Sequence, residues 1–201
     1  MAGRIRIGGV LSGKVRASRE VGREGSRSLR TVVTGEPCVD FRTTRTIRSA
    51  IEIRAPLDVV WRVLTDFDAY PAWNPHVRRL VGKPQAGRRI GIHTRPPGGR
   101  TVVMRPIILD WSPPHELRWR ATFVSRRLFS GEHGFRLEEV APDRVRFAQD
   151  ETFSGLLVPL YARLRLPSTR LGFAQMNEAL RTRAEAEAAA AAPAASVGAG
   201  A

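Results

Sequence analysis

The order of strand-like and helix-like segments between residues 46 and 185 constrains the fold of this 201-residue chain more than any other feature. Thr46 to Ile53 alternates between polar and apolar residues, which predicts a first strand with Ile47, Ile51 and Ile53 on one face. Further strand-like runs follow at 76–82, 88–95, 101–110, 116–124, 131–139 and 144–153, separated by turn signals rich in proline and glycine. Consecutive strands joined by tight turns indicate an antiparallel meander, and its apolar face has to be covered by a helix.

Helical segments are predicted before and after this meander. Pro56 begins a first helix, because proline at the first helical position loses no hydrogen bond, and residues 66–70 form a second, short one. Residues 156–166 form a helical turn or two that Pro167 ends. A last helix is indicated by the spacing i, i+3 and i+7 of Phe173, Met176 and Leu180. We therefore expect an α+β domain in which a curved antiparallel sheet is folded around a C-terminal helix.

The two ends of the chain differ from its middle. Residues 1–44 are rich in glycine, serine and arginine without a sustained period, which predicts a disordered basic tail. Residues 186–201 are nearly all alanine and offer no face to bury, which predicts a second disordered tail. The expected folded unit is therefore 45–185. The single cysteine, Cys38, excludes an internal disulfide and fits a cytoplasmic protein, and no run is long and apolar enough to span a membrane.

The net charge of +14 raises the question of a nucleic-acid partner. Half of it lies in residues 1–48, where eleven Lys and Arg residues face four acidic ones, a net +7. In the remainder most arginines stand between acids or alternate with apolar residues, so the sequence disfavours a nucleic-acid partner. The sequence leaves the oligomeric state open.

Several short blocks of residues resemble those of a known superfamily. Asp58-Val-Val-Trp61, Leu64-Thr-Asp-Phe-Asp-Ala-Tyr70 and Trp73-Asn74-Pro75 are similar to the opening of the SRPBCC superfamily, which includes START, Bet v 1 and polyketide-cyclase-like proteins. Gly131-Glu-His-Gly-Phe135, Glu151-Thr-Phe-Ser-Gly155 and residues 173–180 resemble its later blocks. The resemblance covers residues 46–185. It implies a helix-grip fold, in which a seven-stranded sheet grips a long C-terminal helix and a cavity lies between them.

Strand parity predicts which side chains line such a cavity. The inner faces of the last three strands are mostly apolar, but they include His133, Gln149 and Glu151. Buried polar groups without partners cost on the order of 1–3 kcal/mol each, so these three have to pair with one another, with water or with a ligand. We interpret them as the polar anchor of an apolar pocket. The alternative is a structural His133–Glu151 pair, or Glu151 at an open rim in water.

The remaining candidate ligand-binding residues are apolar. Trp73 either gates the pocket or plugs the core, and Met104 and Met176 suit an adaptable pocket although methionine at such spacing is also ordinary core. The other candidates come from the inner strand faces and the last helix: Trp119, Phe135, Phe153 and Phe173. The four histidines lack the spacing of a zinc site, no nucleophile motif occurs, and we expect no metal, cofactor or catalytic residue.

These features predict binding of a hydrophobic small molecule, such as a lipid, a quinone or a polyketide, by a carrier or sensor. A polyketide cyclase or aromatase is the enzymatic alternative, with His133 or Glu151 moving a proton. A chaperone-activator-like interaction domain is the third, and it would need an exposed apolar patch or a basic face. Arginines 118, 120, 144 and 146 are candidates for such a face, although their pattern favours a solvated sheet.

Overall fold

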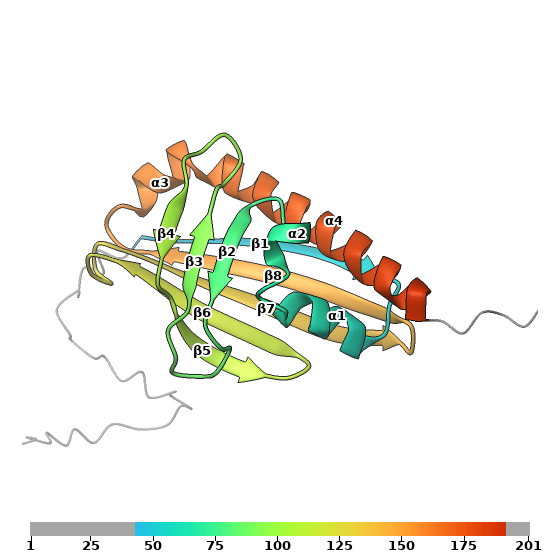
Figure 1. Ribbon diagram of the computed structural model, residues 1–201. Coiled ribbons are helices and arrows are strands. Elements are labelled where there is room, and N and C mark those ends of the chain that lie inside the picture. The colour runs from blue at the N-terminus through green and yellow to red at the C-terminus, as the bar shows by residue number, and fades with distance from the viewer. Residues whose placement is uncertain (1–42, 192–201) are drawn as a thin grey trace, which may run out of the picture. The chain divides into compact units, whose positions relative to one another are not determined.

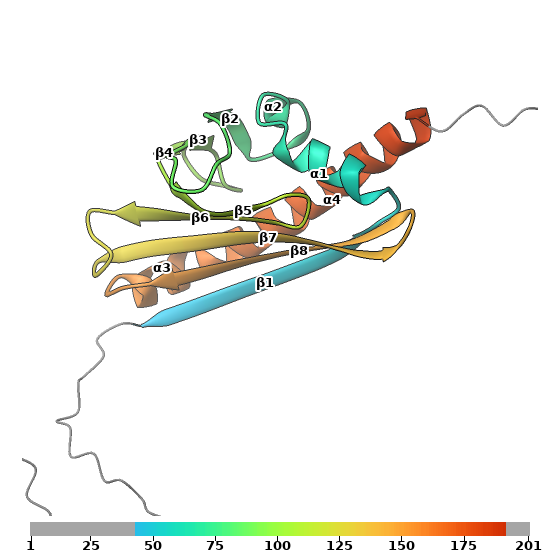
Figure 2. The ribbon, with the colours of Figure 1, turned by 90° about the horizontal axis from the view of Figure 1, so that it is seen from below.

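The computed structural model describes residues 43–191. Five antiparallel strands form the larger sheet, in the order β1-β8-β7-β6-β5: Thr44–Ile53, Arg144–Ser154, Phe129–Ala141, Glu116–Phe123 and Ile107–Ser112. Three short strands form a second sheet in the order β2-β3-β4: Val77–Val81, Gly91–Thr94 and Val102–Met104. Figure 1 shows the second sheet crossing in front of the first, and Figure 2 shows it as a separate layer over β5 and β6.

The expectation of seven strands in one sheet is therefore wrong, because the described residues form eight strands in two sheets. The run predicted at 101–110 splits into β4 and β5 at Pro106, which has no N–H to donate into a strand ladder. The carbonyl of Pro106 instead accepts a hydrogen bond from the Ile90 N–H at 3.0 Å. An isolated bridge between Arg89 and Ile107 lies at this point between the two sheets.

Four helices complete the described part of the chain: α1 (Leu57–Thr65), α2 (Tyr70–Trp73), α3 (Val158–Leu164) and α4 (Leu166–Ala191). α1 agrees with the first helix expected after the first strand. The second was predicted over residues 66–70 and is wrong, because α2 begins at Tyr70 and Pro71 lies in its first turn, where proline is tolerated. Pro167 does not end a helix but lies in the first turn of α4, where proline is tolerated. The predicted boundary at residue 186 falls inside α4, because Ala184 is fully buried and Ala188 packs against the core. Residues 1–42 and 192–201, and with them most of the two predicted tails, lie outside the described residues.

The two faces of the larger sheet differ as strand parity predicts. Leu117, Phe135 and Phe147 are at most 1% exposed and belong to the main core cluster with residues of α1 and α4. On the opposite face Arg118 donates to both carboxylate oxygens of Asp150 at 3.1 Å. Arg120 pairs with Glu132 at 3.0 Å on the same face. These two arginines are therefore held by acids of the sheet, which is typical of a solvated sheet rather than a free basic face.

Candidate functional site

A cavity of about 610 Å³ lies between the larger sheet, the smaller sheet and the helices α3 and α4. Most of its walls are apolar, because the inner faces of β6, β7 and β8 present aromatic and aliphatic side chains there. The sheet side is formed by Trp119, Phe135 and Phe153, and the helix side by Phe173 and Met176. The larger sheet and α4 thus enclose a space that no side chain of the described residues fills.

A hydrogen-bonded row of polar side chains runs behind the cavity wall. The buried Gln149 amide donates to the Asn177 side-chain oxygen and, at 3.2 Å, to the Phe173 carbonyl. Asn177 donates in turn to the Ser49 hydroxyl at 2.8 Å. The Gln149 Oε1 atom lies 3.0 Å from Nε2 of His133, which assigns the hydrogen of the neutral ring to that nitrogen. The row therefore fixes the orientation of the His133 ring from inside the core.

The His133 side chain lies in the cavity wall between aromatic rings. It stacks on Phe173 with ring centroids 4.9 Å apart and an interplanar angle of 9°. The Phe135 ring lies 4.3 Å away and the Trp119 ring 5.5 Å away. Burial in this apolar setting lowers the pKa of His133 from 6.5 to about 4, although the Gln149 hydrogen bond opposes the shift. The imidazole is therefore neutral at neutral pH.

Glu151 is the acidic side chain of the cavity. Its strand position is directly opposite His133 on β7 and Ile47 on β1, and a Cβ placed on Gly131 would lie 3.0 Å from its Oε1 atom. Glycine at position 131 thus leaves room for the carboxyl group. Burial raises the pKa of Glu151 from 4.5 to about 8, and the neighbouring Asp150 charge adds to the shift. The Glu151 side chain lines the cavity, and its carboxyl group is mostly protonated at neutral pH.

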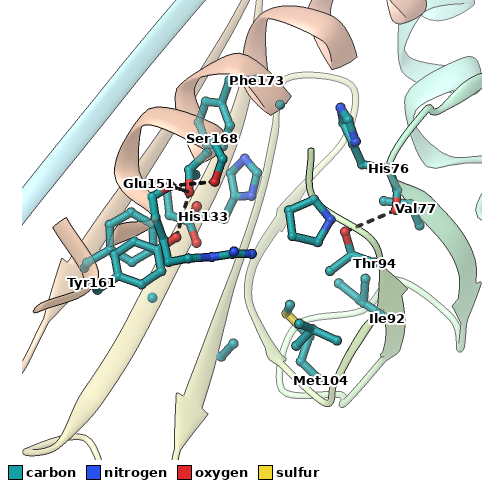
Figure 3. Close-up of a pocket in the computed structure, with 18 of the residues that line it drawn as sticks. His76, Val77, Ile92, Thr94, Met104, His133, Glu151, Tyr161, Ser168 and Phe173 are labelled. Carbon is teal, nitrogen blue, oxygen red and sulfur yellow. Dashed lines mark hydrogen bonds between the residues drawn. The ribbon is translucent and has the colours of Figure 1, made fainter. Parts of the chain in front are cut away.

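Tyr161 of α3 lies on the same side of the cavity as Glu151. Its hydroxyl oxygen is 2.8 Å from the Thr169 hydroxyl oxygen, and burial raises its pKa to about 12. Figure 3 shows Glu151, Tyr161 and Ser168 gathered on one side, and His76, Thr94 and Met104 on the other. The cavity therefore has a polar cluster of Glu151, Tyr161 and Ser168 at the side of α3, and the wall across from it carries the polar side chains of His76 and Thr94 among apolar ones.

Eight of the ten residues predicted from the sequence line the cavity. Gln149 does not, because it lies in the hydrogen-bonded row behind the wall and is 2% exposed. Trp73 does not line the cavity either: its ring packs 4.8 Å from that of Tyr70 and it lines a separate pocket of about 60 Å³. The gating interpretation of Trp73 is therefore wrong, since it contacts the core. The eight that do are Met104, Trp119, His133, Phe135, Glu151, Phe153, Phe173 and Met176.

The proposed His133–Glu151 pair is not formed among the described residues, because the hydrogen bond of His133 goes to Gln149. Sequence reasoning missed Asn177, although its position four residues after Phe173 on one helix face was a signal for it. It also missed Tyr161 and Asn74. Asn74 is 3% exposed and its side-chain oxygen accepts the backbone N–H groups of His76 and Val77 at 2.9 and 3.0 Å.

Among residues 43–191, no group of three or more His, Cys, Asp or Glu side chains is placed to hold a metal ion. None of the helices in that range is long and apolar enough to cross a membrane.

The chain is similar to one family and to several solved structures. Residues 44–192 match the family described as polyketide cyclase / dehydrase and lipid transport. The Zhui aromatase/cyclase from Streptomyces sp. R1128 superimposes with a TM-score of 0.60 at 14% identity, over 71% of this chain and 94% of that one. A point mutant of norcoclaurine synthase from Thalictrum flavum gives 0.57 at 14% identity, over 73% and 97%. A START superfamily protein from Mycobacterium smegmatis gives 0.54 at 19% identity, over 71% and 98%. No curated protein matches the sequence.

Proposed function

Because the chain belongs to the polyketide cyclase / dehydrase and lipid transport family, we propose that it binds a hydrophobic small molecule in its internal cavity, as a carrier or sensor. The observation that carries this proposal is the apolar cavity of about 610 Å³. Binding sites for small molecules typically measure roughly 300–1,000 Å³ and place a few polar groups in a mainly apolar wall. Burial of an apolar ligand removes its surface from water, which is favourable by about 25 cal/mol per Å².

The protonation states of His133 and Glu151 suit an uncharged oxygen-containing group of the ligand. A neutral His133 and a protonated Glu151 offer hydrogen-bond donors and acceptors without a net charge at neutral pH. A ligand carbonyl or hydroxyl group would find partners there, and a negatively charged group would find the guanidinium of Arg165, which also lines the cavity. The apolar body of the ligand would extend between Trp119 and Met176. The proposed ligand is therefore apolar with one oxygen-containing end.

One observation favours an enzyme of the cyclase or dehydrase kind as a second candidate. His133 and Glu151 occupy opposed positions on adjacent strands and both line the cavity, and the carboxyl group of Glu151, with a pKa of about 8, is near its titration point at neutral pH. Such a group can donate a proton during a dehydration and, once ionised, accept one during an aldol-type ring closure. Turnover of a polyketide substrate that is lost in Glu151→Gln, with folding and ligand binding retained, would establish this candidate.

The binding proposal is tested by filling the cavity. Ala121 lines the cavity, so Ala121→Phe places a ring in the ligand's space. The matched control is Ala148→Phe, on β8 of the same sheet. Ala148 alternates with Phe147 and Gln149, so its side chain lies on the opposite face of the sheet and does not line the cavity. Fluorescence titration with the apolar probe N-phenyl-1-naphthylamine measures binding, and native mass spectrometry of the purified chain identifies any retained molecule.

We expect Ala121→Phe to weaken probe binding by at least about tenfold, and Ala148→Phe to leave it unchanged. Circular dichroism establishes that both variants are folded. Equal probe affinity in the wild type and a folded Ala121→Phe variant would refute ligand binding in this cavity.

A further inference from the structure

Exposed apolar side chains gather at one end of the domain, where the β6–β7 loop meets α3. Among residues 43–191, ten large hydrophobic side chains are strongly exposed. Six of the ten lie in two short segments that we call the apolar tip: Phe123, Val124, Leu156, Leu157, Leu160 and Leu164. Their exposed fractions range from 38% to 94%. A concentration of this kind marks an interaction surface rather than the usual scatter of single apolar residues.

The two segments of the apolar tip form one continuous structure. The Leu156 N–H donates to the Arg127 carbonyl at 3.0 Å, and the Leu157 N–H donates to the Leu128 carbonyl at 3.1 Å. Gly155 approaches Leu128 so closely that a Cβ on it would lie 2.5 Å from the Leu128 carbonyl oxygen. Figures 1 and 2 both place the β6–β7 loop beside α3 at the same end of the sheet. The exposed side chains therefore belong to one rigid surface.

The charge around the apolar tip has a single sign. Residues 123–131 and 155–165 contain Arg126, Arg127, Arg163 and Arg165 and no acidic residue. The first three are exposed, and within residues 43–191 none of the four forms an ion pair. Arg118, Arg120 and Arg136 of the larger sheet, by contrast, are paired with acids at 3.0–3.3 Å. Exposed leucines bordered by unpaired arginines are complementary to an apolar layer with an anionic surface.

Val124, the first residue of the β6–β7 loop, has a backbone conformation that is unfavourable for its side chain. Its φ of 63° is the only left-handed value of a non-glycine residue in the described part of the chain. A β-branched side chain is unfavourable there, and asparagine or glycine would relieve the strain. The same valine is 94% exposed and so contributes almost no packing. An apolar, strained and exposed residue is explained by a contact made outside the domain.

We propose that the apolar tip docks on the surface of a bilayer that contains anionic phospholipid. The aliphatic side chains would enter the boundary between headgroups and acyl chains, while Arg126, Arg127 and Arg163 contact lipid phosphates. A second copy of the chain fits less well, because two tips of the same positive sign repel one another. The segment before residue 43 also fits less well, since it carries nine Lys and Arg residues and four acidic ones, a net +5.

Docking in this orientation would bring the cavity to the lipid. Four of the six tip residues are exposed and at the same time line the cavity, so the cavity reaches the surface at the tip: Phe123, Leu157, Leu160 and Leu164. An apolar ligand would pass between bilayer and cavity without crossing water. The docking proposal does not depend on a bound ligand, because its evidence is the exposed surface alone.

Vesicle sedimentation with the full chain tests the proposal. The probes are vesicles of phosphatidylcholine alone and of phosphatidylcholine mixed with phosphatidylglycerol. One variant, Val124→Asn/Leu156→Asn, changes two tip residues that do not line the cavity. A second variant, Arg126→Ala/Arg127→Ala, removes two of the exposed charges. The matched controls are Val140→Asn, near the other end of β7, and Arg78→Ala/Arg79→Ala, an exposed pair on β2.

We expect binding to the mixed vesicles and little to phosphatidylcholine alone. Each tip variant should weaken that binding roughly tenfold, because an arginine near an anionic surface and a buried aliphatic side chain each contribute several-fold. The controls should bind as the wild type does. The contribution of the basic N-terminal segment is the same in every variant, so it cannot produce this pattern.

Three outcomes would overturn the proposal: no binding to the mixed vesicles, binding that the two tip variants leave unchanged, and an equal loss in the control variants. If the chain did not bind the mixed vesicles, the tip would instead be expected to bind an acidic protein partner. Circular dichroism identifies any variant that has lost its fold. Should Arg126→Ala/Arg127→Ala unfold, Val124→Asn/Leu156→Asn still decides, since asparagine relieves the strain at position 124 and is expected to raise the melting temperature while weakening vesicle binding.

Discussion

Replacing Glu151 by glutamine should change how the stability of the domain depends on pH. Burial raises the pKa of Glu151 in the folded state from 4.5 to about 8, so the protonated form is the one that the fold accommodates. Its contribution to stability is fully present below about pH 4.5 and is lost as the pH rises through about 8. Glutamine keeps the shape and cannot ionise. The Glu151→Gln variant should therefore lack this loss on the alkaline side.

The magnitude follows from the two pKa values. Between about pH 6 and about pH 8, linkage with an unfolded pKa of 4.5 and a folded pKa of about 8 removes about 2 kcal/mol of stability. Water or a ligand in the cavity solvates the carboxylate and reduces the loss, so about 2 kcal/mol is an upper limit. For a domain of this size that corresponds to a fall in melting temperature of roughly 4–8 °C.

Thermal unfolding followed by circular dichroism at a series of pH values measures the difference. The wild type should lose stability relative to Glu151→Gln as the pH rises from about 6 to about 8. The control is Glu132→Gln, which removes a carboxylate from the outer face of the neighbouring strand, where it pairs with Arg120 at 3.0 Å. Parallel curves for the wild type and Glu151→Gln over this range would refute the assignment of a buried, protonated Glu151.

Two further predictions concern the stability of the frame around the cavity. Asn177→Leu removes the hydrogen bonds that join Gln149 and Ser49 and should lower the free energy of unfolding by about 2–3 kcal/mol, measured with urea; an unchanged urea midpoint would contradict the role of the row. Gly155→Ala should cost about 2 kcal/mol or more, because φ is +122° and the new Cβ would lie 2.5 Å from the Leu128 carbonyl oxygen. Gly98→Ala, where a Cβ would have nothing within 4 Å, should cost clearly less, and equal losses would argue against the close approach.

Local patterns in the sequence were sufficient to predict most of the helices and strands and the apolar face of the larger sheet. Alternation placed Trp119, Phe135 and Phe153 on the inner side, because successive side chains of a strand point to opposite faces. The same rule placed His133 and Glu151 inside, and the structure brings both to the cavity wall. The division of residues 101–110 at Pro106 was also present in the sequence, since proline cannot donate to a ladder, but the run was interpreted as one strand.

Which side chains contact one another across the fold was decided only by the tertiary structure. Strand parity does not say whether His133 contacts Glu151 beside it on the sheet or Gln149, because both positions face inward; the carboxamide of Asn177 on α4 orients Gln149 and so decides the choice. Trp73 packs outside the cavity for the same reason, since the path of α2 over the core depends on how two sheets and a helix pack together. The apolar tip likewise joins residues near 124 with residues near 160, which are adjacent only because the β6–β7 loop hydrogen-bonds to the segment before α3. A periodic pattern is a local property of the chain and determines which face a residue occupies, whereas the identity of its neighbour depends on backbone packing between distant segments, which no local pattern contains.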